Sequence, residues 1–185
     1  MRVDGGLEPI AEELRQEVLA SDVVHTDDTP VTLAQSSGGG SRQSRVWVYL
    51  NREGRHWYEF TDSRKRDGPA RVFKDFTGYL QADAYGGYDQ LFFLGGATEV
   101  ACMAHVRRKF VDAEATDPVL AKEAVDRIRA LFQIEEAAKD LSDAARAELR
   151  DQNAPVTGGV QRLAGAGRDA GAAEVTAGAC DHLCA

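Results

Sequence analysis

The sequence has little cysteine, no long apolar run and no surplus of positive charge. Its 185 residues contain three cysteines, Cys102, Cys180 and Cys184. That number is too small for a disulfide scaffold, and an odd number is typical of a reducing compartment. No apolar run approaches the about 20 residues of a membrane span. The first residues, MRVDGGLEPIAEELRQEV, lack the basic and apolar regions of a signal peptide. We therefore expect a cytoplasmic protein with no membrane segment.

The net charge of −8 argues against a simple nucleic-acid-binding module, because such modules normally carry a basic surplus. The charge is unevenly distributed, however. Residues 1–40 hold two basic and eight acidic side chains, whereas residues 41–80 hold nine basic and five acidic ones. Two interpretations of this basic middle stay open. It consists of solvated loops, or it forms a phosphate-facing patch beside a carboxylate-rich site.

Hydrophobic periodicity predicts a mixed α/β fold with an antiparallel hairpin inside it. The hairpin is the clearest signal, because RVWVYL (45–50) and HWYEF (56–60) flank the glycine-containing loop NREGR. Pro30 restricts the strand that begins at Val23 to an edge or a bulge. The other expected elements are helices over 7–20, 69–79 and 107 to about 149, strands at 23–24, early in 79–92 and over 98–106, and a flexible loop over 34–44. Within the last helical stretch, Asp117-Pro118 marks a helix boundary and Ser142 is the expected N-cap of the final segment.

The composition changes after about residue 155, where glycine and alanine dominate and aromatic residues are absent. We therefore expect three regions: an N-terminal helix over 1–20, a core over 21–153, and a Gly/Ala-rich tail over 154–185. Ordering such a tail is entropically costly, so it should make few core contacts.

Two aspartates stand in unusual positions for charged residues. Asp27 ends the apolar strand VVHTDD, and Asp83 lies in YLQADAY. Carboxylates in apolar strands are costly unless they are paired, hydrogen-bonded or metal-bound. Mg²⁺ uses one or two carboxylates together with phosphate oxygens. Asp27 and Asp83 could therefore share a cation on adjacent strands. Alternatively, the aspartates could simply cap turns, with Asp28 before Thr-Pro in the first segment and Asp83 in the second.

Other polar clusters are weaker signals. Cys102 and His105 lie three residues apart, which is more typical of a buried thiol beside a polar histidine than of a metal site. Arg107, Arg108 and Lys109 follow and could hold phosphates or form a solvated face. The segment Cys180-Asp-His-Leu-Cys184 offers zinc-type ligands, but no second cluster stands at a usual spacing.

Four segments in order resemble the signatures of the insertion sequence 66 transposase family. They are HTDDTPVTL, SRVWVYL, LQADAYGGYDQLF and TEVACMAHVRRKFVDA. The family's motifs run H-A-D-E-T-P, R-x-W-x-Y, L-Q-x-D-G-Y-x-G-Y and C-W-A-H-x-R-R-K-F. The resemblance covers about residues 7–153 and stops there, so the tail over 154–185 is expected to be non-homologous to the family. Within the resemblance, Asp28 stands where the family often has Glu and Met103 where it usually has Trp.

The resemblance implies a ribonuclease H-like core and an Asp-Asp-Glu triad. Asp27 resembles the first catalytic aspartate and Asp83 the second, and both would bind Mg²⁺ or Mn²⁺. The partners implied are the DNA ends of a mobile element, contacted through Arg107, Arg108 and Lys109. A full-length transposase or a second copy of the chain is a further possible partner. The reaction implied is DNA cleavage and strand transfer in DNA transposition.

The family's third carboxylate, in an I-D-N-N-x-x-E-like motif, has no counterpart in this sequence. The tail fits translation in a shifted reading frame, so we expect a partial transposase whose core is incomplete at the C-terminus and which is inactive alone. The alternatives are a non-catalytic remnant that at most binds DNA or a full-length transposase, and a metal-dependent nuclease of the same fold. The nuclease would need a substitute carboxylate, for which Asp112, Glu114 and Asp126 are candidates.

Overall fold

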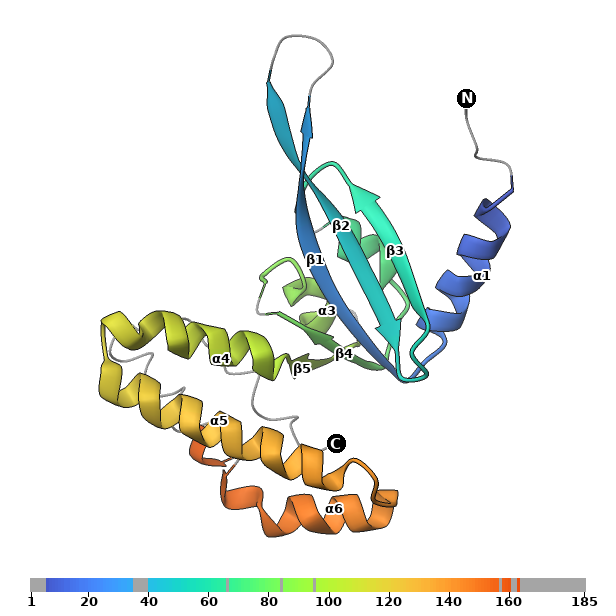
Figure 1. Ribbon diagram of the computed structural model, residues 1–185. Coiled ribbons are helices and arrows are strands. Elements are labelled where there is room, and N and C mark those ends of the chain that lie inside the picture. Colours follow the sequence, from blue (N-terminus) through green and yellow to red (C-terminus); the bar gives the residue numbers. More distant parts are fainter. Residues whose placement is uncertain are drawn as a thin grey trace. The chain divides into compact units, whose positions relative to one another are not determined.

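The structure is a computed structural model that describes residues 6–34, 40–65, 67–83, 85–94, 96–156, 158–160 and 163. The chain divides into two compact units, Met1–Val100 and Ala101–Ala185. The first, here the sheet unit, carries most of a five-stranded sheet, and the second, here the helical unit, is built from helices (Figure 1). The predicted mixed α/β class is therefore confirmed. Over the described ranges, no helix is long and apolar enough to cross a membrane.

The sheet is mixed, with the strand order β3-β2-β1-β4-β5. The strands are β1 Val23–Ala34, β2 Ser41–Asn51, β3 His56–Thr61, β4 Tyr79–Ala82 and β5 Thr98–Ala101. Antiparallel pairs join β1 to β2 and β2 to β3, whereas β1 runs parallel to β4. Figure 1 shows the β1–β2 ribbon extending well beyond the shorter strands. The parallel pair places the strand that carries Asp27 and Asp28 beside the strand that leads into Asp83.

Aromatic side chains fill the core of the sheet unit. Alternate residues of a strand point to one face, and Trp47 and Tyr49 of β2 are both fully buried. Phe73 meets Tyr49 edge-on, with 5.4 Å between ring centroids. Such ring pairs add about 0.5–1.5 kcal/mol beyond the burial of their area. The helices of this unit are α1 Glu8–Leu19, α2 Asp67–Val72 and α3 Asp89–Phe93.

The helical unit has a smaller core made mostly of aliphatic side chains. Its elements are α4 Met103–Asp112, the 3₁₀ turn η1 Ala113–Ala115, α5 Pro118–Ala138 and α6 Asp143–Gln152. The expected helix boundaries are confirmed by caps. Asp117 accepts the Leu120 N–H at 3.0 Å, and Ser142 accepts the Ala145 N–H at 3.4 Å. Each cap satisfies an N–H that has no partner inside its helix.

The hairpin and the first helix form where the sequence predicts them. Strands β2 and β3 pair from Arg45↔Thr61 to Leu50↔His56, around the loop of residues 51–55. Gly54 has φ = 81° in this loop, a conformation that glycine adopts without a Cβ clash. Helix α1 lies within the predicted range 7–20.

The first two strands are longer than the sequence predicts. Strand β1 continues through Pro30 to Ala34, and β2 begins at Ser41, so the expected loop over 34–44 is wrong for Ala34 and for residues 41–44. The additional residues of β1 and β2 pair with each other as far as Ala34↔Ser41. Gln43 of β2 also donates a hydrogen bond to Thr32 Oγ1 of β1 at 2.8 Å. Pro30 is tolerated because β1 pairs with β4 only from Val23 to His25, which leaves the proline on an open edge.

Two predicted elements are too long. The expected helix over 69–79 ends at Val72 because the chain must turn into β4 at Gly78. A Cβ at Gly78 would lie 2.4 Å from the Asp22 carbonyl oxygen, which accepts the next N–H at 2.8 Å. The expected strand over 98–106 is also wrong in its second half. Strand β5 ends at Ala101, and Met103 already begins α4.

The expectation of few core contacts after residue 154 is wrong for Val160. This side chain is fully buried in a cluster with Phe110, Ala124 and Ile128, and Leu163 packs against the same cluster. A single buried valine contributes about 1.5–3 kcal/mol of burial free energy. The remainder of the predicted tail, residues 157, 161, 162 and 164–185, lies outside the described residues.

Candidate carboxylate site

Four charged side chains of the sheet unit form one network, here called the Arg64 cluster: Asp28, Arg45, Arg64 and Asp83. Arg64 Nη2 lies 2.6 Å from Asp28 Oδ1 and 2.7 Å from Asp83 Oδ2. The other oxygen of Asp28 accepts from Arg45 Nη1 at 2.8 Å. Both aspartates therefore lie within hydrogen-bond distance of one guanidinium nitrogen, although 55 residues separate them.

Strand alternation decides which aspartate enters the cluster. Val24 and Thr26 of β1 are buried on one face of the sheet, and Asp28 follows at the same period of two. Its side chain is only 1% exposed. A buried carboxylate is costly without partners, and the two arginines supply them.

Asp27, the predicted first catalytic aspartate, is exposed, and its carboxylate accepts the Asp28 backbone N–H at 2.8 Å. The predicted adjacency of the two strands is present, since β1 pairs with β4 up to His25↔Gln81. Of the two aspartates in β1, it is Asp28 that Arg64 joins to Asp83. The sequence holds the signal that distinguishes them, because the buried positions alternate from Val24 and reach Asp28, not Asp27.

In addition to the two aspartates, Tyr85 contacts Arg64. The Arg64 guanidinium carbon lies 4.1 Å from the centroid of the Tyr85 ring, and the Tyr85 hydroxyl donates to the Arg64 carbonyl oxygen. Cations over aromatic faces gain about 0.5–2 kcal/mol, depending on desolvation. Burial opposes the charged guanidinium, but hydrogen bonds and charge from Asp28 and then Asp83 outweigh it and raise the Arg64 pKa above its ordinary value. Arg64 is therefore permanently cationic here.

Tyr88 lies near the cluster, because the charges of Asp83, Asp28 and Arg64 all act on its hydroxyl. Its hydroxyl lies 3.4 Å from Thr26 Oγ1, and its ring meets Trp47 edge-on with centroids 6.3 Å apart. Burial, assisted by the charges of Asp83 and Asp28, raises the Tyr88 pKa well above its usual range. The phenol therefore stays protonated and can act as a hydrogen-bond donor beside the carboxylates.

The Arg64 cluster fits a divalent cation only in part. Two carboxylates within reach of one positive centre match the ligand set of Mg²⁺, which is completed by phosphate oxygens and water. Asp28 and Asp83 would be these ligands. In the described part of the chain, no group of three or more His, Cys, Asp or Glu side chains is arranged to hold a metal ion.

The predicted DNA-contacting residues Arg107, Arg108 and Lys109 are exposed along α4. They occupy the middle of this helix and not its start, because α4 begins at Met103. Cys102 precedes the same helix as a free thiol, and His105 Nδ1 is buried without a hydrogen-bond partner among the described residues. Cys180 and Cys184 lie outside the described residues.

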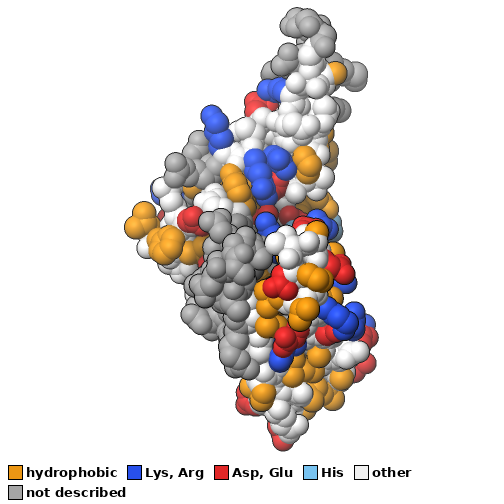
Figure 2. Space-filling model, turned by 90° about the vertical axis from the view of Figure 1, so that its left-hand side faces the viewer, with side chains coloured by type: hydrophobic (Ala, Val, Ile, Leu, Met, Phe, Trp, Pro, Cys, Tyr) orange, Lys and Arg blue, Asp and Glu red, His pale blue; other side chains and the backbone are white. Residues whose placement is uncertain are grey.

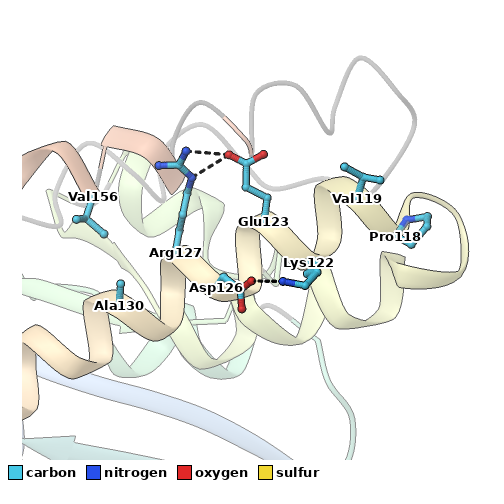
Figure 3. A pocket seen from close by; sticks show the side chains of 8 residues that line it. All are labelled: Pro118, Val119, Lys122, Glu123, Asp126, Arg127, Ala130 and Val156. Atoms are coloured by element: carbon cyan, nitrogen blue, oxygen red, sulfur yellow. Dashed lines mark hydrogen bonds and ion pairs between the residues drawn. The ribbon is translucent and has the colours of Figure 1, made fainter.

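The three candidate substitutes for a third carboxylate all lie in the helical unit. Asp112 and Glu114 are exposed, and Asp126 is paired with Lys122 at 2.6 Å and with Arg129 at 2.6 Å. An open hollow of about 710 Å³ borders this part of α5. Figure 3 shows that its charged lining residues are paired with one another, Lys122 with Asp126 and Arg127 with Glu123.

Ion pairs on the helical unit are mostly short-range pairs at the surface. Arg150 and Glu135 form the best of them, a bidentate contact of 2.8 and 2.9 Å between α6 and α5. Figure 2 shows acidic, basic and hydrophobic side chains lying among one another on one face of the molecule. Exposed pairs of this kind contribute about 0–1 kcal/mol each, in contrast to the partly buried Arg64 cluster with its 1% exposed Asp28 side chain.

Comparison with known proteins identifies the family. The model of the family described as "Transposase IS66 family" matches residues 1–179, which extends past residue 153, the expected end of the resemblance. Among similar proteins of Sinorhizobium fredii (strain NBRC 101917 / NGR234), the uncharacterized protein y4qI is 28% identical over 165 residues and the uncharacterized protein y4jD is 27% identical over 172.

These alignments cover 79% and 84% of this chain, but only 30% and 34% of the relatives. The chain therefore spans about a third of the length of the curated relatives it matches. The resemblance read from the four motifs is confirmed by the family match over nearly the whole chain. The chain belongs to the IS66 family of transposases.

Proposed function

We propose that this chain carries two catalytic carboxylates of a DNA-cleaving and strand-transferring enzyme of DNA transposition, on a ribonuclease H-like core. The observation that supports the proposal is the pairing of β1 with β4. It brings the Asp27–Asp28 segment next to Asp83, which is the adjacency that a shared carboxylate site requires. The family match supports the role in transposition.

Asp83 is one ligand of the proposed cation, and the other comes from β1. Asp28 has the geometry for it, because Arg64 Nη2 contacts both carboxylates, whereas Asp27 is the residue that the family motif selects. A bound Mg²⁺ or Mn²⁺ would supply charge stabilisation to the phosphate oxygens during in-line attack. The chain's own residues hold the carboxylates in place through Arg45 and Arg64, and these guanidinium groups can bind phosphate.

DNA and a second protein chain are the proposed partners. Arg107, Arg108 and Lys109 are exposed cations on one helix, and such side chains bind phosphates without reading the base sequence. A full-length transposase would supply the third carboxylate that this sequence lacks, and a second copy of this chain is the other proposed partner.

A second candidate function is a non-catalytic remnant that binds DNA or a full-length transposase. One observation favours it specifically. Both carboxylates of the Arg64 cluster are already neutralised by arginines, and the described residues offer no third carboxylate to the same site. This candidate predicts the inactivity that the motif analysis expects.

A nicking assay separates the two candidates. The chain is incubated with DNA that carries the element's ends, in Mn²⁺ or Mg²⁺, beside Asp83→Asn, Asp28→Asn and Asp27→Asn. Catalysis predicts nicking that is lost in Asp83→Asn, and loss in only one of the other two variants identifies the second ligand. DNA binding without nicking supports the remnant. Nicking that persists in Asp83→Asn contradicts the proposed site and indicates a contaminating nuclease.

A further inference from the structure

We propose that Arg64 is a positioning residue that acts as an internal counter-cation: it assembles Asp28 and Asp83 in the absence of metal and competes with a divalent cation for them. The inference rests on the proposed function for the kind of cation. It goes beyond that function in assigning a role to an arginine that no motif selects. Arg64 lies in the segment after β3, outside every helix and strand of the sheet unit.

The contacts show that the guanidinium occupies the position between the carboxylates. Nη2 is within 2.7 Å of an oxygen of each aspartate, and Nε donates to Asp28 Oδ1 at 2.7 Å. A divalent ion that bound these same oxygens would lie next to the guanidinium, and like charges at such short distances repel strongly. The cation and Arg64 therefore cannot both occupy this position.

The two aspartates differ in what remains after Arg64 leaves. Asp28 is 1% exposed and keeps the 2.8 Å contact between its Oδ2 and Arg45 Nη1, so it stays fixed. Asp83 is 20% exposed, and Arg64 itself is 34% exposed. A cation from solvent can thus reach Asp83 first, while the arginine has room to move outward.

Tyr85 determines how firmly the Arg64 guanidinium is held between the two carboxylates. Its ring lies under the guanidinium at 4.1 Å, and its hydroxyl binds the Arg64 backbone. Because Tyr85 lies two residues after Asp83, the same short segment carries the carboxylate and the group that retains its counter-cation. Once released, a guanidinium is well suited to bidentate binding of a phosphate.

The test is Mn²⁺ binding to the purified chain without DNA, measured by calorimetry and by the paramagnetic signal of free Mn²⁺. Arg64→Ala should bind Mn²⁺ about tenfold or more tightly than the parent chain. Arg64→Lys keeps the positive charge but loses the planar set of guanidinium donors, so its Mn²⁺ affinity should lie between those of the parent chain and Arg64→Ala. The gain should vanish in the double variant Arg64→Ala/Asp83→Asn.

Arg42→Ala is the matched control, because it removes one guanidinium from an exposed pair with Asp62. It should leave Mn²⁺ affinity unchanged, which separates competition at the site from a change in net charge. If Arg64→Ala does not fold by circular dichroism, Tyr85→Leu replaces it, and a severalfold gain in affinity is expected from the loosened arginine.

Equal or weaker Mn²⁺ binding in folded Arg64→Ala overturns the inference, and so does a gain that survives Asp83→Asn or appears equally in Arg42→Ala. The nicking assay is separate from this measurement. Tight Mn²⁺ binding by Arg64→Ala without nicking would support the competition and contradict catalysis. Nicking with no effect of Arg64 on Mn²⁺ affinity would support catalysis and contradict the competition.

Discussion

The sheet unit and the helical unit place their charges differently. In the sheet unit, which has an aromatic core, the Asp28 side chain is almost completely buried and is paired with two arginines. In the helical unit, pairs such as Glu135–Arg150 lie at the surface, around a core of small aliphatic residues and one phenylalanine. Burial of charge costs free energy that exposed pairs avoid. Among the described residues, the sheet unit therefore stabilises a buried carboxylate by pairing it with arginines, whereas the helical unit keeps its ion pairs at the surface.

Tryptophan fluorescence can report the sheet unit by itself, because the chain's two tryptophans, Trp47 and Trp57, both lie within it. Far-ultraviolet circular dichroism mostly reports the helices, of which α5 with 21 residues is the longest described. The two signals therefore allow each prediction below to be assigned to one unit.

The largest effect is expected from Trp47→Ala, at about 3–5 kcal/mol of unfolding free energy. Trp47 is fully buried, contacts Tyr88 edge-on and donates its indole N–H to Thr61 at 2.8 Å. Urea unfolding followed by the fluorescence of Trp57 measures the loss. Ile128→Ala, also at a fully buried position, should cost about 2–5 kcal/mol, seen mainly in circular dichroism. Equal shifts of both signals in both variants would show that the units unfold as one.

Asp28→Asn should cost about 2–4 kcal/mol, because it leaves two guanidinium groups facing a neutral amide in a buried position. The partial exposure of the arginines, 23% for Arg45 and 34% for Arg64, places the loss at the lower end. Asp27→Asn is the matched control, since its exposed carboxylate makes only a local bond to the next N–H among the described contacts. We expect the urea midpoint to be highest for the parent chain, slightly lower for Asp27→Asn and lowest for Asp28→Asn. A reversed order of the two variants would contradict the burial argument.

Glu135→Gln should cost only about 0.2–1 kcal/mol, the range of partly exposed ion pairs. Hydrogen bonding to Arg150, and then the charges of Arg150 and Arg146, lower the Glu135 pKa below its ordinary 4.5. A lowered carboxylate pKa stabilises the fold above pH 4.5, and this contribution is lost as the pH falls through the lowered value. The dichroism melting temperature of the parent should therefore drop more between pH 6 and pH 3 than that of Glu135→Gln. Identical pH profiles would show that this pair contributes nothing.

The smallest effect concerns His25 in the sheet unit. Burial lowers its pKa below 6.5, and a hydrogen bond with Gln81 opposes the shift only in part. A histidine that stays neutral when folded destabilises the fold as the pH falls from 6.5 through the lowered pKa. Fluorescence-detected stability should therefore decline slightly over this window, and His25→Gln should remove the decline. An unchanged slope in the variant would assign the decline to another group.

The local features of the fold follow from the sequence because short-range chemistry decides them. The hairpin at NREGR, the cap at Ser142 and the boundary at Asp117-Pro118 depend on neighbouring residues alone, and all three form as predicted. The family is equally readable, since its motifs are continuous segments. The polarity pattern of β1 also contains the choice between Asp27 and Asp28, although the family motif pointed to Asp27.

Only the tertiary structure decided the remaining features. Strand β2 begins at Ser41 because β1 is there to pair with it, and helix α2 ends at Val72 because Gly78, further along, must approach the Asp22 carbonyl. Arg64 lies in a polar stretch that no motif selects, and its role arises only when β1 and β4 bring Asp28 and Asp83 to one guanidinium. Long-range electrostatic contacts depend on which strands are adjacent, and adjacency is set by the packing of the whole sheet and not by any local stretch of residues.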